Sequence, residues 1–384
     1  MWRAIASNAM TLFIVFLLAV GVAVIWAKDQ YSAEGPLASA ICLRVESGTN
    51  MNALAERLAD QGAISNLAIF RAGAEYSGKS SQLKAGSFLI QPGTSMEGII
   101  NTVTASGRST CGTEINFRIG VLRAEVKVRE LDPETSKYVE IISFDPAEEA
   151  PEAYVDYAER GDTRYRVTLA EGVTSWQVVQ ELRQAEFLEG SLSAMPDEGS
   201  LAPDSYEVKR GSERQALVDR MTAAQSAVLA EAWEGRAEGL PLNSPEEALI
   251  LASIVEKETG LAEERPQVAS VFVNRLRKGM LLQTDPTVIY GVTEGRGNLG
   301  RGIRQSELDR ETPYNTYVIK GLPPTPIANP GRAAIEAALN PDTTEYIFFV
   351  ADGTGGHAFA KTLREHNNNV AEWRKIEAER AKNQ

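Results

Sequence analysis

Apolar and polar residues alternate along the chain in patterns that predict several distinct elements. Ala9 to Ala27 is a run of 19 residues without charge, apolar apart from Thr11 and Gly21. At about 1.5 Å per residue, a helix of this length just crosses a bilayer core of roughly 30 Å. The run therefore predicts one transmembrane helix (9–27), preceded by a short cytoplasmic tail (1–8) and followed by a polar linker (28–38).

A cleaved signal peptide is the alternative for this N-terminal run. The residues before Lys28 place a bulky side chain where a cleavage site needs a small one, which favours an uncleaved anchor. Arg3 lies on one side of the run, whereas on the other side the charge of Lys28 is offset by Asp29. By the positive-inside rule, this difference weakly places the N-terminus in the cytoplasm. We therefore expect a single-pass membrane protein, with the first few residues in the cytoplasm and everything after Lys28 outside.

A glycine turn leading through a Thr, Asn or Ser cap into an amphipathic helix occurs three times, at 48–58, 93–103 and 172–182. Strand-like stretches adjoin these helices at 41–45, 84–90 and 167–169. The strand–helix–helix–strand order of 41–90 resembles a LysM module, a small glycan-binding unit. We expect a LysM-like domain at 39–112 and a second LysM-like element at 166–195.

The rest of the chain divides into a β-rich segment and a patterned C-terminal region. Strands are expected at 115–121, 125–128 and 137–144, in an insert (113–165) that ends in an exposed acidic loop at 145–162. A long helix is expected at 212–233. Ser244 as N-cap, Pro245 at the first position and Glu247 at the capping-box position open a helix that is apolar on nearly every face. The predicted fold class is α+β, with a mainly helical, mixed C-terminal domain (196–384).

The composition of the chain argues against several classes of ligand. The chain has 39 basic and 52 acidic residues and a net charge of −13, so nucleic acid is not an expected partner. Two histidines and two cysteines predict no metal centre, and no cofactor is expected. The G-x-G-x-x-G match at 295–300 precedes a polar, glycine-broken segment, so no nucleotide is expected either. Cys42 and Cys111 could form a disulfide or remain two thiols.

Glu258 is the strongest candidate for chemistry. It continues the apolar face of Leu251, Ile254 and Val255 near the end of the buried helix, where desolvation would raise the pKa of its carboxyl group and suit it to donate a proton. Glu256 points about 200° away around the helix and is a weaker candidate. The alternative for both acids is a charged helix end that pairs with Lys257 or Arg265.

Amides, hydroxyls and tyrosines gather in the irregular segments after this helix. Such side chains bind sugars through hydrogen bonds to ring hydroxyls and contacts with the apolar face of the ring, although each also occurs in ordinary turns. The candidates for substrate binding are Gln283, Thr284, Asp285, Tyr290, Tyr314, Asn315, Tyr317 and Asn329. His357, beside an expected hairpin turn, and Asn274, on the inner side of a helix, are taken as structural.

Several long motifs in one order resemble the YceG-like family of endolytic murein transglycosylases. They are LASIVEKETG, RPQVASVFVNRL, LQTDPTVIYG, ETPYNTY, GLPPTPIANPG and FFVADGTGGHAF, within 196–369. The insert at 113–165 departs from the family pattern. The resemblance implies that Glu258, the second acid of the EKE motif, is the catalytic glutamate.

The resemblance also implies an activity. The expected enzyme is a lyase that cleaves nascent peptidoglycan glycan strands between N-acetylmuramic acid and N-acetylglucosamine, leaving 1,6-anhydromuramoyl ends and terminating strand elongation. Peptidoglycan synthases are the implied protein partners. A non-catalytic peptidoglycan-binding scaffold and a water-using muramidase, with Asp285 as its second carboxylate, are the alternatives.

Overall fold

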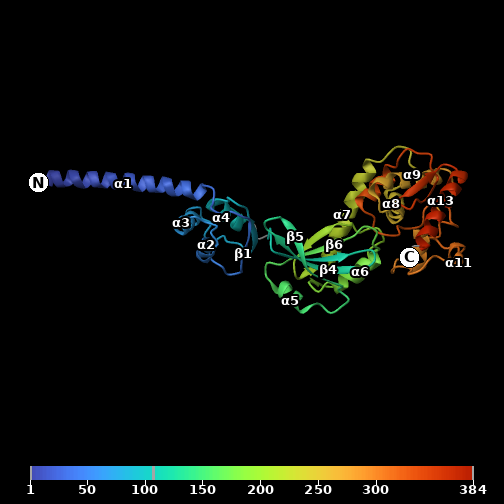
Figure 1. Cartoon of the computed structure of the whole chain (residues 1–384), viewed down its shortest axis with the longest axis horizontal. Helices are drawn as coiled ribbons and strands as arrows, with labels where there is room; N and C mark the ends of the chain where they lie inside the picture. Colours follow the sequence, from blue (N-terminus) through green and yellow to red (C-terminus); the bar gives the residue numbers. More distant parts are fainter. Residues whose placement is uncertain (1, 106–108, 383–384) are drawn as a thin grey trace. The chain divides into compact units, whose positions relative to one another are not determined.

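The computed structural model describes residues 2–105 and 109–382, and the side chains of residues 2–9, including Arg3 of the orientation argument, lie outside this description. The chain forms two compact units. Unit 1 comprises Met1–Ile115, Lys127–Ser143 and Ala150–Arg164, and unit 2 comprises Asn116–Val126, Phe144–Glu149 and Tyr165–Gln384. Helices and strands both contribute, so the α+β class is confirmed (Figure 1).

Helix α1 (Trp2–Ser32) contains the apolar run. Its Met10–Ser32 portion is long and apolar enough to cross a membrane, a test that a signal sequence would also pass. The helix continues four residues past Lys28, to Ser32, into the segment expected as a polar linker. The Tyr31 ring explains the extension, because it packs on the core of unit 1 and contacts Gly73 so closely that a Cβ there would lie 2.2 Å from it.

The first small module follows the predicted order of strand, helix, helix and strand. Its elements are β1 (Ile41–Val45), α2 (Met51–Asp60), α3 (Leu67–Tyr76) and β2 (Gly86–Ile90), followed by α4 (Met96–Ala105). Strands β1 and β2 are antiparallel, with Ile41 opposite Ile90. Leu54, Phe70, Phe88 and Ile99 are almost fully buried in one apolar core. The LysM identity of this module stays a prediction.

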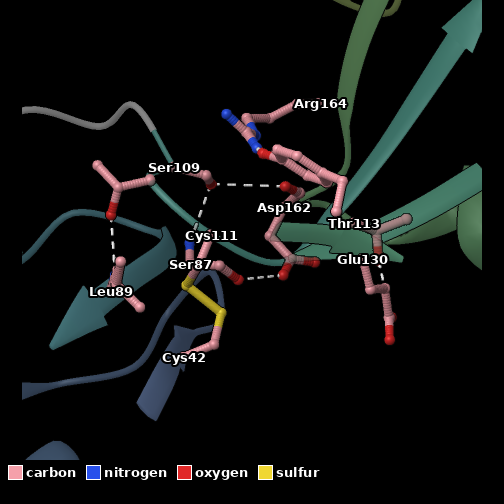
Figure 2. Close-up of a disulfide and its surroundings, with 11 residues drawn as sticks. Cys42, Ser87, Leu89, Ser109, Cys111, Thr113, Glu130, Asp162 and Arg164 are labelled. Carbon is pink, nitrogen blue, oxygen red and sulfur yellow. Dashed lines mark hydrogen bonds between the residues drawn. A yellow bond between two sulfur atoms is a disulfide. The ribbon is translucent and has the colours of Figure 1, made fainter. Parts of the chain in front are cut away.

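Cys42 and Cys111 form a disulfide within unit 1, with Cα atoms 5.8 Å apart (Figure 2). Hydrogen bonds from the backbone N–H groups of Thr110 and Cys111 to the Ser87 carbonyl also hold the segment beside β2. Ser87 Oγ contacts the carboxylate of Asp162, which pairs with Arg44 at 3.0 Å. The sequence left the state of the two cysteines open, and the fold brings them together.

The β-rich segment contains β3 (Thr113–Ile119), β4 (Ala124–Asp132) and β5 (Lys137–Phe144), close to the predicted strands. With β6 (Arg164–Leu169) and β8 (Ser205–Val208) they form a sheet of order β5-β4-β3-β6-β8. Strands β6 and β8 are antiparallel, and the short strands β7 (Leu188–Glu189) and β9 (Ser212–Glu213) are parallel. The acidic segment at 145–162, expected as an exposed loop, contains helix α5 (Glu152–Glu159), which has no buried residue.

The C-terminal region is mainly helical. Its elements are α6 (Ser175–Gln184), α7 (Arg214–Glu234), α8 (Pro245–Glu258), the 3₁₀ turn η1 (Ala262–Glu264), α9 (Arg265–Arg277), α10 (Asp285–Thr293), α11 (Gln305–Leu308), α12 (Arg332–Leu339) and α13 (Leu363–Lys382), with a hairpin of β10 (Phe348–Ala351) and β11 (His357–Ala360). Figure 1 shows α8 beside α9 in this region. Leu251, Ile254 and Phe272 share one fully buried core, which confirms the central position expected for α8.

Candidate functional site

Glu258 is the last residue of α8, and the backbone of Thr259 turns away from the helix. Leu251, Ile254 and Val255, on the face that Glu258 continues, are fully buried. Glu258 itself is only partly buried. The end of α8 therefore places the Glu258 carboxyl group at the boundary between the buried core and solvent.

Burial raises the pKa of the Glu258 carboxyl group, and the negative charge of Asp285 raises it further. The Thr284 hydroxyl donates a hydrogen bond to Glu258 Oε1 and opposes this shift, as do the charges of His357 and Arg275. The raised pKa means that the carboxyl group keeps its proton to a higher pH than an exposed glutamate. It can therefore serve as a proton donor.

The raised pKa predicts that Glu258→Gln stabilises the fold at alkaline pH. Below the unfolded pKa of about 4.3, the wild-type carboxyl group is protonated in both the folded and the unfolded state. Its ionisation therefore does not change the free energy of unfolding in that pH range. As pH rises towards the folded pKa, the unfolded state loses its proton first and wild-type stability falls. The variant lacks this loss, which is about 1.4 kcal/mol for each unit by which the pKa is raised. Urea unfolding at pH 4 and pH 8 should show a gain only at pH 8, and an equal difference at both would contradict it.

Asp285 is the first residue of α10 and follows Thr284, so the contact between Thr284 and Glu258 brings Asp285 to the same place. Asp285 is exposed, and the hydroxyl of Tyr317 donates to its Oδ1 at 2.6 Å. Gln283 is exposed too and has a φ of 49°, in the left-handed region that non-glycine residues rarely occupy. Gln283, Asp285 and Tyr317 are thus polar residues in or bonded to the segment that contacts the acid through Thr284.

Arg275 and His357 are two charged or titratable residues near Glu258 that the sequence argument did not select. Arg275 is buried on α9 and donates to the backbone carbonyl of Ile347. His357 lies at the start of β11, as predicted, with Nδ1 2.8 Å from Glu264 Oε2. Because they approach from other elements, no spacing in the sequence could have indicated them.

Both carboxyl oxygens of Glu256 contact other groups of the protein. Its Oε2 accepts a hydrogen bond from the Gly331 N–H at 3.0 Å, and its Oε1 lies 3.6 Å from the Arg265 guanidinium. Arg265 also pairs with Glu171 at 3.3 Å. Glu256 therefore ties α8 to the start of α9 and the N-terminus of α12.

Tyr290 and Tyr314 form a second group with Glu198. Their rings are 4.9 Å apart, and the Tyr290 hydroxyl donates to Glu198 Oε2 at 3.1 Å. Glu198 also accepts from the backbone N–H of Ser175 at 2.8 Å, and burial raises its pKa. Both tyrosines are partly exposed and pack against the core that contains Leu251 and Ile254.

Asn315 and Asn329 are buried rather than available to a substrate. The Asn315 amide donates to the carbonyls of Leu308 and Arg310, which holds the loop before it. The Asn329 amide donates to Val173 and accepts from the Leu201 N–H. Their expected role in sugar binding therefore needs correction, because every polar atom of each amide faces the protein. Asn274 likewise donates to the carbonyls of Thr344 and Tyr346, which confirms its structural role.

Across residues 2–105 and 109–382, no group of three or more His, Cys, Asp or Glu side chains is arranged to hold a metal ion. The chemistry that the described residues offer is thus that of a desolvated acid, a neighbouring carboxylate, and polar and aromatic groups.

Comparisons with known proteins identify a family and several relatives. A family model described as the YceG-like family matches residues 144–372. The chain is 27% identical to an endolytic murein transglycosylase of Bacillus subtilis, over 91% of this chain and 89% of that protein. It is 35% identical to an endolytic murein transglycosylase of Streptococcus pneumoniae, over 46% of this chain and about a third (32%) of that protein. A putative yceG-like protein of known structure from Listeria monocytogenes is 24% identical, with a TM-score of 0.46, over 86% of this chain and 99% of the other.

Proposed function

Because the chain belongs to the YceG-like family, we propose that it is an endolytic murein transglycosylase that cuts glycan strands of peptidoglycan. The observation that carries the proposal is the Glu258 carboxyl group, which stands desolvated at the end of a buried helix with part of the residue open to solvent. Such a group can protonate a leaving oxygen near neutral pH. The names of the curated relatives supply the substrate class.

The proposed reaction uses Glu258 twice. The acid first protonates the glycosidic oxygen between N-acetylmuramic acid and N-acetylglucosamine, and the C1–O bond breaks. The resulting carboxylate then takes the proton of the C6 hydroxyl as this oxygen bonds to C1 of the same muramic acid. One bond breaks and one forms, the proton returns to Glu258, and no water is consumed. Because the attacking hydroxyl belongs to the substrate, proximity is supplied without a second catalytic carboxylate.

Positive charge develops on the sugar ring as the C1–O bond breaks, and Asp285 is assigned to stabilise it. The Tyr317 hydroxyl holds Asp285 through a hydrogen bond of 2.6 Å. Gln283 is exposed next to this pair and is assigned to sugar hydroxyls. Tyr290 and Tyr314 are assigned to a sugar further along the strand, where their paired rings offer an apolar face.

The N-terminal part would position this reaction at the membrane. The apolar helix α1 is proposed to anchor the protein in the inner membrane, with everything after it in the periplasm. The disulfide between Cys42 and Cys111 supports this orientation, because disulfides persist in oxidising compartments. The modules at 39–112 and 166–195 are proposed to bind glycan in the manner of LysM, and the enzyme is proposed to act on nascent strands beside peptidoglycan synthases.

Mass spectrometry of the products tests the proposed chemistry. The full-length chain in detergent should release fragments of several disaccharides with 1,6-anhydromuramoyl ends from uncrosslinked glycan strands. Reducing ends would instead support a muramidase that uses water, with Asp285 as its second carboxylate. Binding to the strands without new ends would support a scaffold. Either result would overturn the proposed reaction.

A further inference from the structure

Thr284 stands at the N-cap of α10, yet its hydroxyl does not cap the helix. A threonine at this position usually accepts a hydrogen bond from a backbone N–H of the first turn, which stabilises the helix by about 1 kcal/mol. Here the hydroxyl donates to Glu258 Oε1 instead. Helix α10 therefore lacks the stabilisation of a side-chain cap, and the Thr284 hydroxyl contacts the Glu258 carboxyl group on α8 instead.

Two other buried threonines hold Thr284 in place. The Thr284 N–H donates to Thr316 Oγ1 at 3.1 Å, and the Thr284 carbonyl accepts from Thr287 Oγ1 at 2.8 Å. The hydroxyls of Thr287 and Thr316 are themselves 2.8 Å apart. All three residues are at most 2% exposed. The backbone of Thr284 is thus fixed on both its donor and its acceptor side, and its hydroxyl has a defined direction.

The preceding residue gives a second sign of constraint. Gln283 takes a left-handed φ of 49°, and its N–H donates to the Thr316 carbonyl at 3.0 Å. Non-glycine residues in this conformation are strained by about 1 kcal/mol or more, and such strain gathers at functional sites. The backbone before α10 is therefore held in a costly conformation that directs the Thr284 hydroxyl towards Glu258.

We propose that Thr284 is a positioning residue for Glu258, which fixes the carboxyl group through Oε1 and leaves Oε2 as the oxygen that gives and regains the proton. This inference deepens the proposed function and rests on it. The carbonyl oxygen of a neutral carboxylic acid is a better acceptor than its hydroxyl oxygen, so the hydrogen bond that Thr284 donates to Oε1 favours the proton on Oε2. When Oε2 loses the proton to the substrate, the hydrogen bond from Thr284 becomes charge-assisted and stabilises the carboxylate.

Thr284 also sets how readily the acid ionises. The groups whose charge acts on Glu258 come from three other elements: Asp285 on α10 opposes ionisation, whereas Arg275 on α9 and His357 on β11 favour it. The hydrogen bond from Thr284 is the strongest of the influences that offset burial. Without it the carboxyl group would hold its proton to a higher pH.

The test compares Thr284→Val, which removes the hydroxyl and keeps the shape, with Thr284→Ser, which keeps the hydroxyl. Thr293→Val is the matched control, because Thr293 lies on the same helix and its hydroxyl donates to the Ile289 carbonyl. Full-length proteins in detergent are assayed for glycan cleavage across pH. For Thr284→Val we expect kcat to fall by about tenfold or more with KM little changed, and the alkaline limb of the profile to move up by about one pH unit. Thr284→Ser and Thr293→Val should keep the wild-type limb.

If Thr284 were purely structural, Thr284→Val would lower the cleavage activity by the same factor at every pH and leave the pH of the alkaline limb unchanged. This result would overturn the proposal. A serine variant as impaired as the valine variant would overturn it too, because the methyl group would then be the important part. Infrared titration of the Glu258 carboxyl band, identified by its loss in Glu258→Gln, measures the same shift without substrate. The positioning role is thus tested even if the wild type proves to lack lytic activity.

Discussion

Glu258→Gln is expected to lower the turnover of glycan cleavage by about a thousandfold, the largest effect of any substitution in this chain. A glutamine has no proton to give to the glycosidic oxygen and cannot take one from the C6 hydroxyl, and general acid–base catalysis contributes about 10² to 10⁴. The glutamine amide can still accept the hydrogen bond from Thr284, so the site should keep its shape. Counting anhydromuramoyl ends by mass spectrometry, with glycan binding measured separately, checks the prediction.

Glu256→Gln is the matched control for this prediction. It makes the same chemical change two residues earlier, at a side chain that contacts Gly331 and Arg265. The amide oxygen can still accept from the Gly331 N–H, so we expect turnover within a few-fold of wild type and some loss of stability. A Glu258→Gln variant with near-normal turnover would remove Glu258 from its assigned role. A Glu256→Gln variant that is folded but inactive would show that the loss of turnover is not specific to Glu258.

The sequence predicted the elements of this fold better than their ends. Strands β1 and β5 have the predicted bounds, and α8 opens with the Ser244 cap, because these signals are local. Helix α1 runs past its apolar segment since Tyr31 packs on Gly73. Helix α5 lies in a segment whose acidic composition indicated a loop, and none of its residues is buried. Such differences arise from packing and from weak local propensity, which periodicity does not register.

The candidate site was predictable where the residues share a segment and unpredictable where distant segments meet. Glu258 follows from the buried face of α8, and Thr284 and Asp285 are adjacent in the chain. Arg275 and His357 reach the acid from α9 and β11, and a sequence pattern gives no distance between separate elements. Asn329 illustrates the opposite error: an amide in an irregular segment resembles a sugar ligand until burial shows that it bonds the backbone.

Loss of the disulfide is the second large effect that we expect. The bond closes a loop between positions 69 residues apart, and the chain-entropy relation for a loop of this length gives about 4 kcal/mol of stabilisation. Cys42→Ser combined with Cys111→Ser should lower the free energy of unfolding of unit 1 by about this amount. The hydrogen bonds from Thr110 and Cys111 to Ser87 remain available in the variant, so unit 1 should still fold at low temperature.

Both cysteines belong to unit 1, whereas Glu258, Thr284 and Asp285 belong to unit 2. Urea unfolding should show that the double variant unfolds at a lower denaturant concentration than the wild type. A reducing agent should reproduce this change in the wild type and have no effect on the double variant, which serves as its control. Two reactive thiols in the denatured, unreduced wild type would contradict the disulfide, and with it the argument that residues after α1 face an oxidising compartment.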